Sequence, residues 1–159
     1  MRSRRALMLR PLAVLVCIGM ALLGCSPSAL ASLLPAESGP LVKVTTRGGE
    51  CADGPCRSIL EIARDGTVTE VLPRSVDIGT VPADVMAALD AAIMAADFDT
   101  IRARPFTGEC PVNFDGQETI YEFAAPARVE RIATCETEID PDDPLFMATT
   151  AALVAGDGV

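Results

Sequence analysis

The chain has 159 residues, half of them hydrophobic, with 22 acidic and 13 basic side chains and a net charge of −9. Four of the 13 arginines and lysines, but no acidic residue, lie in the first 24 residues, so the remaining chain has 9 basic and 22 acidic groups and a net charge of −13. This charge argues against a nucleic-acid partner, because binding a polyphosphate begins with clustered Lys and Arg.

The first 24 residues predict export. Arginines at positions 2, 4, 5 and 10 precede the uncharged apolar run Leu12–Leu23. The run is too short for a transmembrane helix, which needs about 20 apolar residues, but it fits the hydrophobic region of a signal peptide. It ends in "LLGC", which resembles the lipobox of bacterial lipoproteins. By that resemblance residues 1–24 are removed, and Cys25 carries the lipid that anchors the protein to the cell membrane or outer membrane, facing the extracytoplasmic side.

Two other readings of this region remain open. The small residues of "ALA" at 29–31 also fit ordinary cleavage after Ala31, which would release a soluble protein. The segment "SRRALM" is similar to a twin-arginine signal, although the strongly hydrophobic run favours the general secretory route. Every alternative predicts export.

The next segments are a tether and the start of a domain. Residues 25–40 are rich in Pro and Ser and have no apolar periodicity, as in a flexible linker, so the expected domain spans residues 41–157. Residues 41–47, "LVKVTTR", alternate as a strand does.

Residues 58–72 predict a hairpin that turns at Asp65-Gly66. A two-residue turn would place Glu61 opposite Glu70, an unfavourable pair of like charges. A three-residue turn with Gly66 in the left-handed conformation pairs Ile62 with Val68 instead. That register puts Leu60, Ile62, Val68 and Leu72 on one face.

Residues 82–96 predict a helix that starts at Pro82. Its apolar positions follow the helical period, with Val85, Ala88, Leu89, Ala92, Ile93 and Ala96 on one stripe. Met86 and Met94 are expected to pack in the core or at its edge rather than to bind a soft metal.

The C-terminal half predicts a loop, a hairpin and a helix. Residues 102–118 have no period and many turn residues, whereas 119–125 and 128–135 read as two strands around Pro126. A helix follows with Asp143 as its N-cap and Pro144 at its first position. The expected fold class is α+β: an antiparallel sheet of two hairpins plus an N-terminal strand, packed by two helices on one face.

Four cysteines in the expected domain predict disulfide bonds. An even number of cysteines in an exported chain allows three pairings of Cys51, Cys56, Cys110 and Cys135. Geometry favours Cys51 with Cys56, which closes a tight loop, and Cys110 with Cys135. A redox centre is disfavoured by the four-residue spacing and the acidic neighbours of the first pair, and a zinc site by the distant second pair.

The residue types limit the chemistry. The chain has no histidine, which removes Ser-His-Asp, Cys-His and histidine-ligated zinc sites. Carboxylates at Glu109, Asp115 and Glu118 leave a carboxylate-dependent hydrolase as one alternative. The carboxylates of the acidic run 136–143 suggest a calcium site as an alternative. The run lacks the EF-hand spacing, however, and is more typical of a solvated turn. We expect no metal, no cofactor and no enzyme.

The loop from 104 to 116 is the candidate binding segment, because ordered loops of this length are often functional. Its candidate residues are Arg104, Phe106, Glu109, Phe114 and Asp115. The two phenylalanines are either exposed anchors or fillers of the sheet edge, and Phe114, nearer the strand, is expected to be core more often than Phe106. An inhibitor-like presentation of residues 104–112 to a protease is another alternative.

The segments "GGECADGPC", "RDGTV" and "FTGECPVNFDGQETIYEF" together resemble a family of small uncharacterised bacterial lipoproteins or exported domains. The resemblance covers roughly residues 40–150 and implies that Cys51, Cys56 and Cys110 are framework cysteines. It implies no activity. The sequence therefore predicts a lipid-anchored extracytoplasmic binding or structural module, with a protein partner that it does not identify.

Overall fold

The computed structural model describes residues 39–52 and 54–156. The expected signal peptide, residues 1–24, the lipidation candidate Cys25, the tether up to residue 38 and the last three residues, 157–159, lie outside the described residues. The residues from Gly39 onward form one unit.

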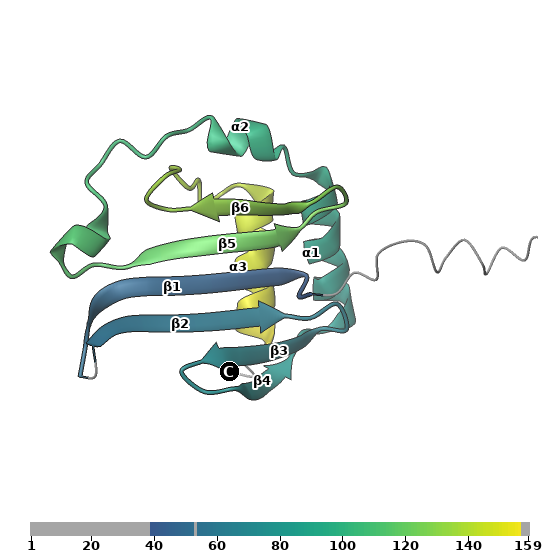
Figure 1. Ribbon diagram of the computed structural model, residues 1–159. Helices are drawn as coiled ribbons and strands as arrows, with labels where there is room; N and C mark the ends of the chain where they lie inside the picture. The colour runs from purple at the N-terminus through teal and green to yellow at the C-terminus, as the bar shows by residue number, and fades with distance from the viewer. Residues whose placement is uncertain (1–38, 53, 157–159) are drawn as a thin grey trace, which may run out of the picture. The chain divides into compact units, whose positions relative to one another are not determined.

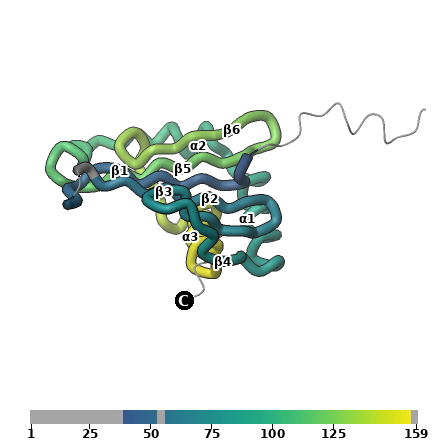
Figure 2. Tube along the Cα trace, turned by 60° about the horizontal axis from the view of Figure 1, so that its bottom comes forward, coloured from purple at the N-terminus to yellow at the C-terminus, as the bar shows by residue number. Residues whose placement is uncertain are grey.

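Within the described residues, six antiparallel strands form one open sheet in the order β4-β3-β2-β1-β5-β6 (Figure 1). The strands are β1 (Val42–Cys51), β2 (Gly54–Ile62), β3 (Thr67–Leu72), β4 (Val76–Thr80), β5 (Glu118–Ala124) and β6 (Val129–Ala133). The main helices, α1 (Ala83–Ala95) and α3 (Pro144–Gly156), lie behind this sheet in Figure 1 and on one side of it in Figure 2. The predicted α+β class, with two helices on one face, is confirmed.

The hairpin of β2 and β3 has the predicted register near its turn. Ile62 is paired with Val68, Gly66 has a φ of 87°, and the Asp65 carboxylate accepts a hydrogen bond from the Thr67 N–H at 2.9 Å. That hydrogen bond lowers the pKa of Asp65. Farther along, a register shift pairs Leu72 with Ile59, so the prediction that Leu72 shares a face with Leu60 and Ile62 is wrong. An extra residue in one strand turns the following side chains to the other face.

Strand β4 was not predicted. It is a five-residue edge strand that contains a glycine, and its burial does not alternate strongly. A Cβ on Gly79 would collide with the carbonyl oxygen of Gly156 at the end of α3. The reason for this glycine therefore lies in its contact with Gly156, which is 77 positions later in the chain.

Both long helices match their predicted positions. Pro82 precedes the first residue of α1, and Leu89 and Ile93 of its apolar stripe are buried. Asp143 caps α3, since its carboxylate accepts a hydrogen bond from the Leu145 N–H at 3.0 Å. Met86 packs against the core as expected, but Met94 is 61% exposed and is not a core residue.

A short helix that the sequence did not suggest, α2 (Phe98–Arg102), follows α1. Its N-cap Asp97 accepts hydrogen bonds from the N–H and hydroxyl of Thr100, which lower the pKa of Asp97. Hydrogen bonds to Asp99 and to Glu130 of β6 raise the pKa of Arg102. Hydrogen bonds from Arg128, and to a smaller extent from Arg102, lower the pKa of Glu130. These ion pairs hold α2 beside β6.

The core lies between the sheet and the helices. Phe123 is fully buried, with its ring centroid 5.9 Å from that of Phe98 and 6.3 Å from that of Phe146. Tyr121 on the same face stacks beside Phe123, and burial raises its pKa. The side chains that alternate with these residues point to the opposite face of the sheet, and no helix within residues 39–52 and 54–156 covers that face (Figure 1).

Candidate functional site

Two disulfide bonds join Cys51 to Cys56 and Cys110 to Cys135, with Cα–Cα distances of 5.2 and 5.1 Å. This is the pairing that the sequence favoured. Disulfides persist in oxidising surroundings, and these two indicate an extracytoplasmic protein. The second bond ties the long loop to Cys135, two residues beyond the end of β6.

The long loop packs against the C-terminal end of β1. Gly48 and Gly49 have φ values of 94° and 77°, and the register with β2 shifts between Arg47 and Glu50. A Cβ on Gly48 would lie 2.7 Å from the carbonyl oxygen of Gly116 and 2.9 Å from a methyl carbon of Val112. Only glycine permits both this backbone conformation and this close approach. We call residues 48–52 together with 109–117 the disulfide tip.

Within the tip, the loop forms a short 3-10 helix, η3 (Pro111–Phe114). Its ends are fixed by hydrogen bonds from Asn113 N–H to the Cys110 carbonyl oxygen at 3.0 Å and from Gly116 N–H to the Pro111 carbonyl oxygen at 2.8 Å. Asp115 ends the helix in the left-handed conformation, with a φ of 59°. This part of the loop, for which the sequence predicted no secondary structure, is thus an ordered helical turn.

Phe114 projects from η3 with 65% of its surface exposed. Side chains two positions apart on a 3-10 helix point about 240° apart, so packing Val112 against Gly48 turns Phe114 away from β1. The expectation that Phe114 is closer to the core than Phe106 is wrong. Phe106 is the half-buried ring, and its N–H donates to the carbonyl oxygen of Glu136 at 3.0 Å.

The start of the candidate loop is hydrogen-bonded to residues 136–138 and does not form a free, extended binding segment. Pro105 forms an isolated β-bridge with Thr137, and the Glu138 N–H donates to the carbonyl oxygen of Arg104 at 2.8 Å. The Arg104 guanidinium lies 3.3 Å from the Asp140 carboxylate and 3.6 Å from that of Asp143. Arg104 therefore fastens the acidic run 136–143 to the loop.

The three carboxylates proposed for a hydrolase do not meet. Glu109 and Asp115 are exposed, whereas Glu118 is 2% exposed and lies 2.6 Å from Nε of Arg47. Across residues 39–52 and 54–156, no group of three or more Cys, Asp or Glu side chains could hold a metal ion. The burial of Glu118 and its pairing with Arg47 were not predicted, and the cross-strand register of β1 and β5 is the signal that would have found them.

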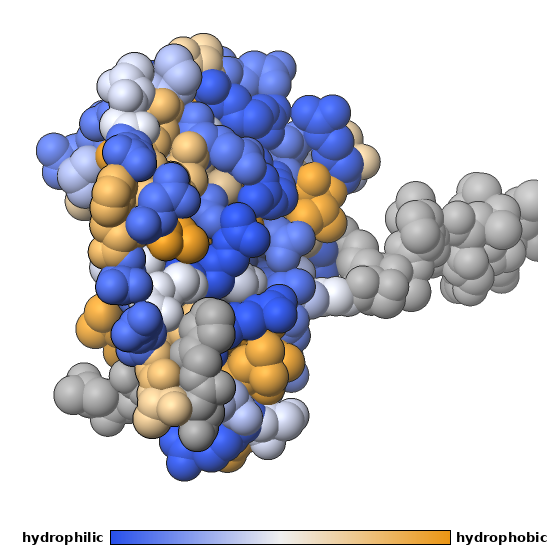
Figure 3. All heavy atoms as spheres, turned by 60° about the vertical axis from the view of Figure 1, so that its left-hand side comes forward, coloured by the Kyte–Doolittle hydropathy of each residue, from blue (hydrophilic) through white to orange (hydrophobic). Residues whose placement is uncertain are grey.

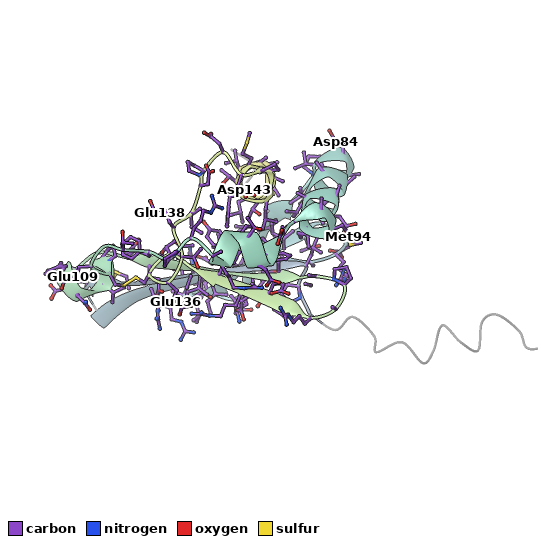
Figure 4. All side chains as sticks on the ribbon, turned by 90° about the horizontal axis from the view of Figure 1, so that it is seen from above. Asp84, Met94, Glu109, Glu136, Glu138 and Asp143 are labelled. Atoms are coloured by element: carbon purple, nitrogen blue, oxygen red, sulfur yellow. A yellow bond between two sulfur atoms is a disulfide. The ribbon has the colours of Figure 1, made fainter. Side chains whose placement is uncertain are left out.

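The disulfide tip and the long helix α1 occupy different parts of the domain. In Figure 4, Glu109 of the tip lies at one end, far from Asp84 and Met94 of α1. Figure 3, turned toward the tip side of Figure 1, shows a mainly hydrophilic surface with isolated hydrophobic residues. Phe114 is the most exposed of the large apolar side chains recorded for the described residues.

The chain matches no protein-family model, and no curated protein shows significant similarity to it. The likeness to small bacterial lipoproteins thus stays a prediction. Among the described residues no helix is long and apolar enough to cross a membrane.

Proposed function

We propose that this protein is an exported, lipid-anchored binding module whose disulfide tip docks a protein partner through Phe114. The observation that carries the proposal is an exposed phenylalanine on a rigid support. The η3 turn is tied by the Cys110–Cys135 bond on one side and seated on Gly48 on the other. A ring held in this way loses little conformational entropy when a partner buries it.

The position of the tip supports this role. Strand β1 runs from Val42 to Cys51, so at about 3.3 Å per residue the tip lies about 30 Å from the point where the chain enters the sheet. The tip and the residue at which the described chain enters the sheet therefore lie at opposite ends of β1, so the entering chain leaves the tip accessible to a partner.

Neither alternative gains support from the geometry. An inhibitor-like loop would need an exposed extended segment around Arg104, but residues 104–106 are bonded to residues 136–138. A hydrolase would need carboxylates that converge, and Glu118 is instead buried against Arg47. We therefore propose binding rather than catalysis.

The lipid anchor is tested by replacing Cys25 with alanine. The wild-type protein is expected in the detergent phase after phase partitioning, because its acyl chains enter the micelles, and Cys25→Ala in the aqueous phase. Mass spectrometry of the N-terminal peptide gives the modification directly. A wild-type protein that is already aqueous and begins at Ser32 would show that cleavage after Ala31 is the correct reading.

The docking role is tested by placing a photo-crosslinking phenylalanine analogue at position 114 of the full-length protein in cells. We expect a discrete adduct at this position. Val129 is the matched control, because it is 61% exposed and lies in β6, outside the tip. Adducts of equal yield at both positions would mean that Phe114 is an ordinary surface residue.

A further inference from the structure

The open face of the sheet has a basic depression of about 330 Å³ in a protein that is acidic overall. Four basic side chains line it: Lys43, Arg47, Arg57 and Arg131. The single acidic residue in the lining is Glu122. A concave surface lined mainly by one sign of charge concentrates ions of the other sign.

Three of these four cations have partners. Lys43 lies 3.2 Å from Glu122, Arg47 lies 2.6 Å from Glu118, and Arg131 lies 2.9 Å from Glu136. Arg57 is exposed and forms no ion pair with any residue of 39–52 or 54–156. The depression therefore has one positive charge that the described residues do not balance.

The unbalanced guanidinium of Arg57 lies next to a second guanidinium, that of Arg47. The register of β1 and β2 sets Arg57 directly opposite Arg47. Cross-strand neighbours have Cβ atoms about 4.5–5.5 Å apart, and like charges at that distance destabilise a sheet. A carboxylate between the two guanidinium groups would relieve this repulsion through charge-assisted hydrogen bonds.

The floor of the depression is less polar than its rim. The next row of residues across the sheet places Ile59 beside Thr45, and Thr45 beside Ile120. Ile59 and Thr45 are both 7% exposed, and the half-buried Ile120 lines the depression. An apolar group seated next to a charged one would therefore find a matching surface.

We propose that this depression binds a small organic monocarboxylate, with its carboxylate on Arg57 and Arg47 and its apolar body over Ile120. One negative charge matches the single unbalanced cation, which favours a monocarboxylate over a phosphate dianion. The volume is within the range of about 300–1,000 Å³ for small-ligand sites. None of the residues that line the depression belongs to the disulfide tip, so this site is distinct from the one proposed around Phe114.

Benzoate and benzamide are suitable probes, because they share a ring and differ in the charge. The full-length exported protein is titrated with each by calorimetry. Benzoate is expected to bind at least about tenfold more tightly than benzamide, and Arg57→Gln to weaken benzoate by at least about tenfold through loss of charge-assisted hydrogen bonds. Arg74→Gln is the control. Arg74 is an exposed residue of the β3–β4 turn, so this substitution removes the same charge outside the depression.

The stability of Arg57→Gln shows whether the variant is intact. Because the change removes a like-charge pair, its melting temperature is expected to equal or exceed that of the wild type. The proposal is overturned if benzamide binds as well as benzoate, or if Arg74→Gln weakens benzoate as much as Arg57→Gln. Tighter binding of inorganic phosphate than of benzoate, lost in Arg57→Gln, would overturn the carboxylate assignment.

Discussion

Replacing Phe123 by alanine is expected to lower the free energy of unfolding by about 3–5 kcal/mol, the cost of truncating a buried phenylalanine. The ring is fully buried in β5 and joins the sheet to Phe98 of α2 and Phe146 of α3. Its removal leaves a cavity at the junction of three elements. Chemical denaturation of the variant and the wild type measures the loss.

Phe114→Ala is the matched control for Phe123→Ala. The same atoms are removed from a ring that is 65% exposed, so the free energy of unfolding is expected to change by less than about 0.5 kcal/mol. Equal losses in the two variants would mean that Phe114 is a structural residue. A loss below about 1 kcal/mol for Phe123→Ala would contradict the core described above.

Removing the Cys110–Cys135 bond by a double change to serine is expected to cost up to about 3.5 kcal/mol. The bond joins residues 25 apart in sequence, and a ring of that size restricts the unfolded chain by about this amount in the chain-entropy model. The Cys51–Cys56 bond joins residues only 5 apart, so its removal is expected to cost about 2 kcal/mol.

The two disulfide variants are also expected to differ in the tip. Without the Cys110–Cys135 bond, η3 is held to β1 by its contacts with Gly48 and Gly49. The amides of Asn113 and Gly116 are therefore expected to exchange hydrogen faster. Unchanged exchange at these amides would show that the glycine contacts alone hold the tip. It would also mean that the disulfide does not help to hold the proposed binding site in place.

The elements with local signals were predictable from the sequence. Helix α3 has an Asp-Pro start and α1 has a Pro start and an apolar stripe, so both were located within one or two residues. The turn at Gly66 was located because glycine and a like-charge argument selected one register. In each case, residues close together in the chain determine the structure.

Elements that depend on distant contacts were not predictable. Strand β4 is short, and its glycine is explained only by the approach of Gly156. The displacement of Leu72 to the other face follows from an irregular register that no turn signal indicates. Burial of Glu118 depends on its pairing with Arg47 across strands 71 residues apart.

The sequence predicted the loop of the candidate site and included Phe114 among its residues, but it ranked the burial of the two phenylalanines in the wrong order. The sequence identified residues 104–116 and their disulfide, yet it assigned the more buried position to the wrong phenylalanine. What decides the matter is the contact between Val112 and Gly48, which turns Phe114 outward. The opposed pair Arg47 and Arg57 likewise becomes visible only once the register of β1 and β2 is known.

We propose that Phe114 binds a partner and does not stabilise the fold. The most direct test of this proposal is the affinity of Phe114→Ala for the protein that position 114 crosslinks, measured together with its melting temperature. An interface anchor contributes about 2 kcal/mol or more, so the affinity is expected to fall about thirtyfold or more while the melting temperature stays the same. Unchanged affinity, or a loss of affinity that accompanies a large fall in melting temperature, would contradict the claim.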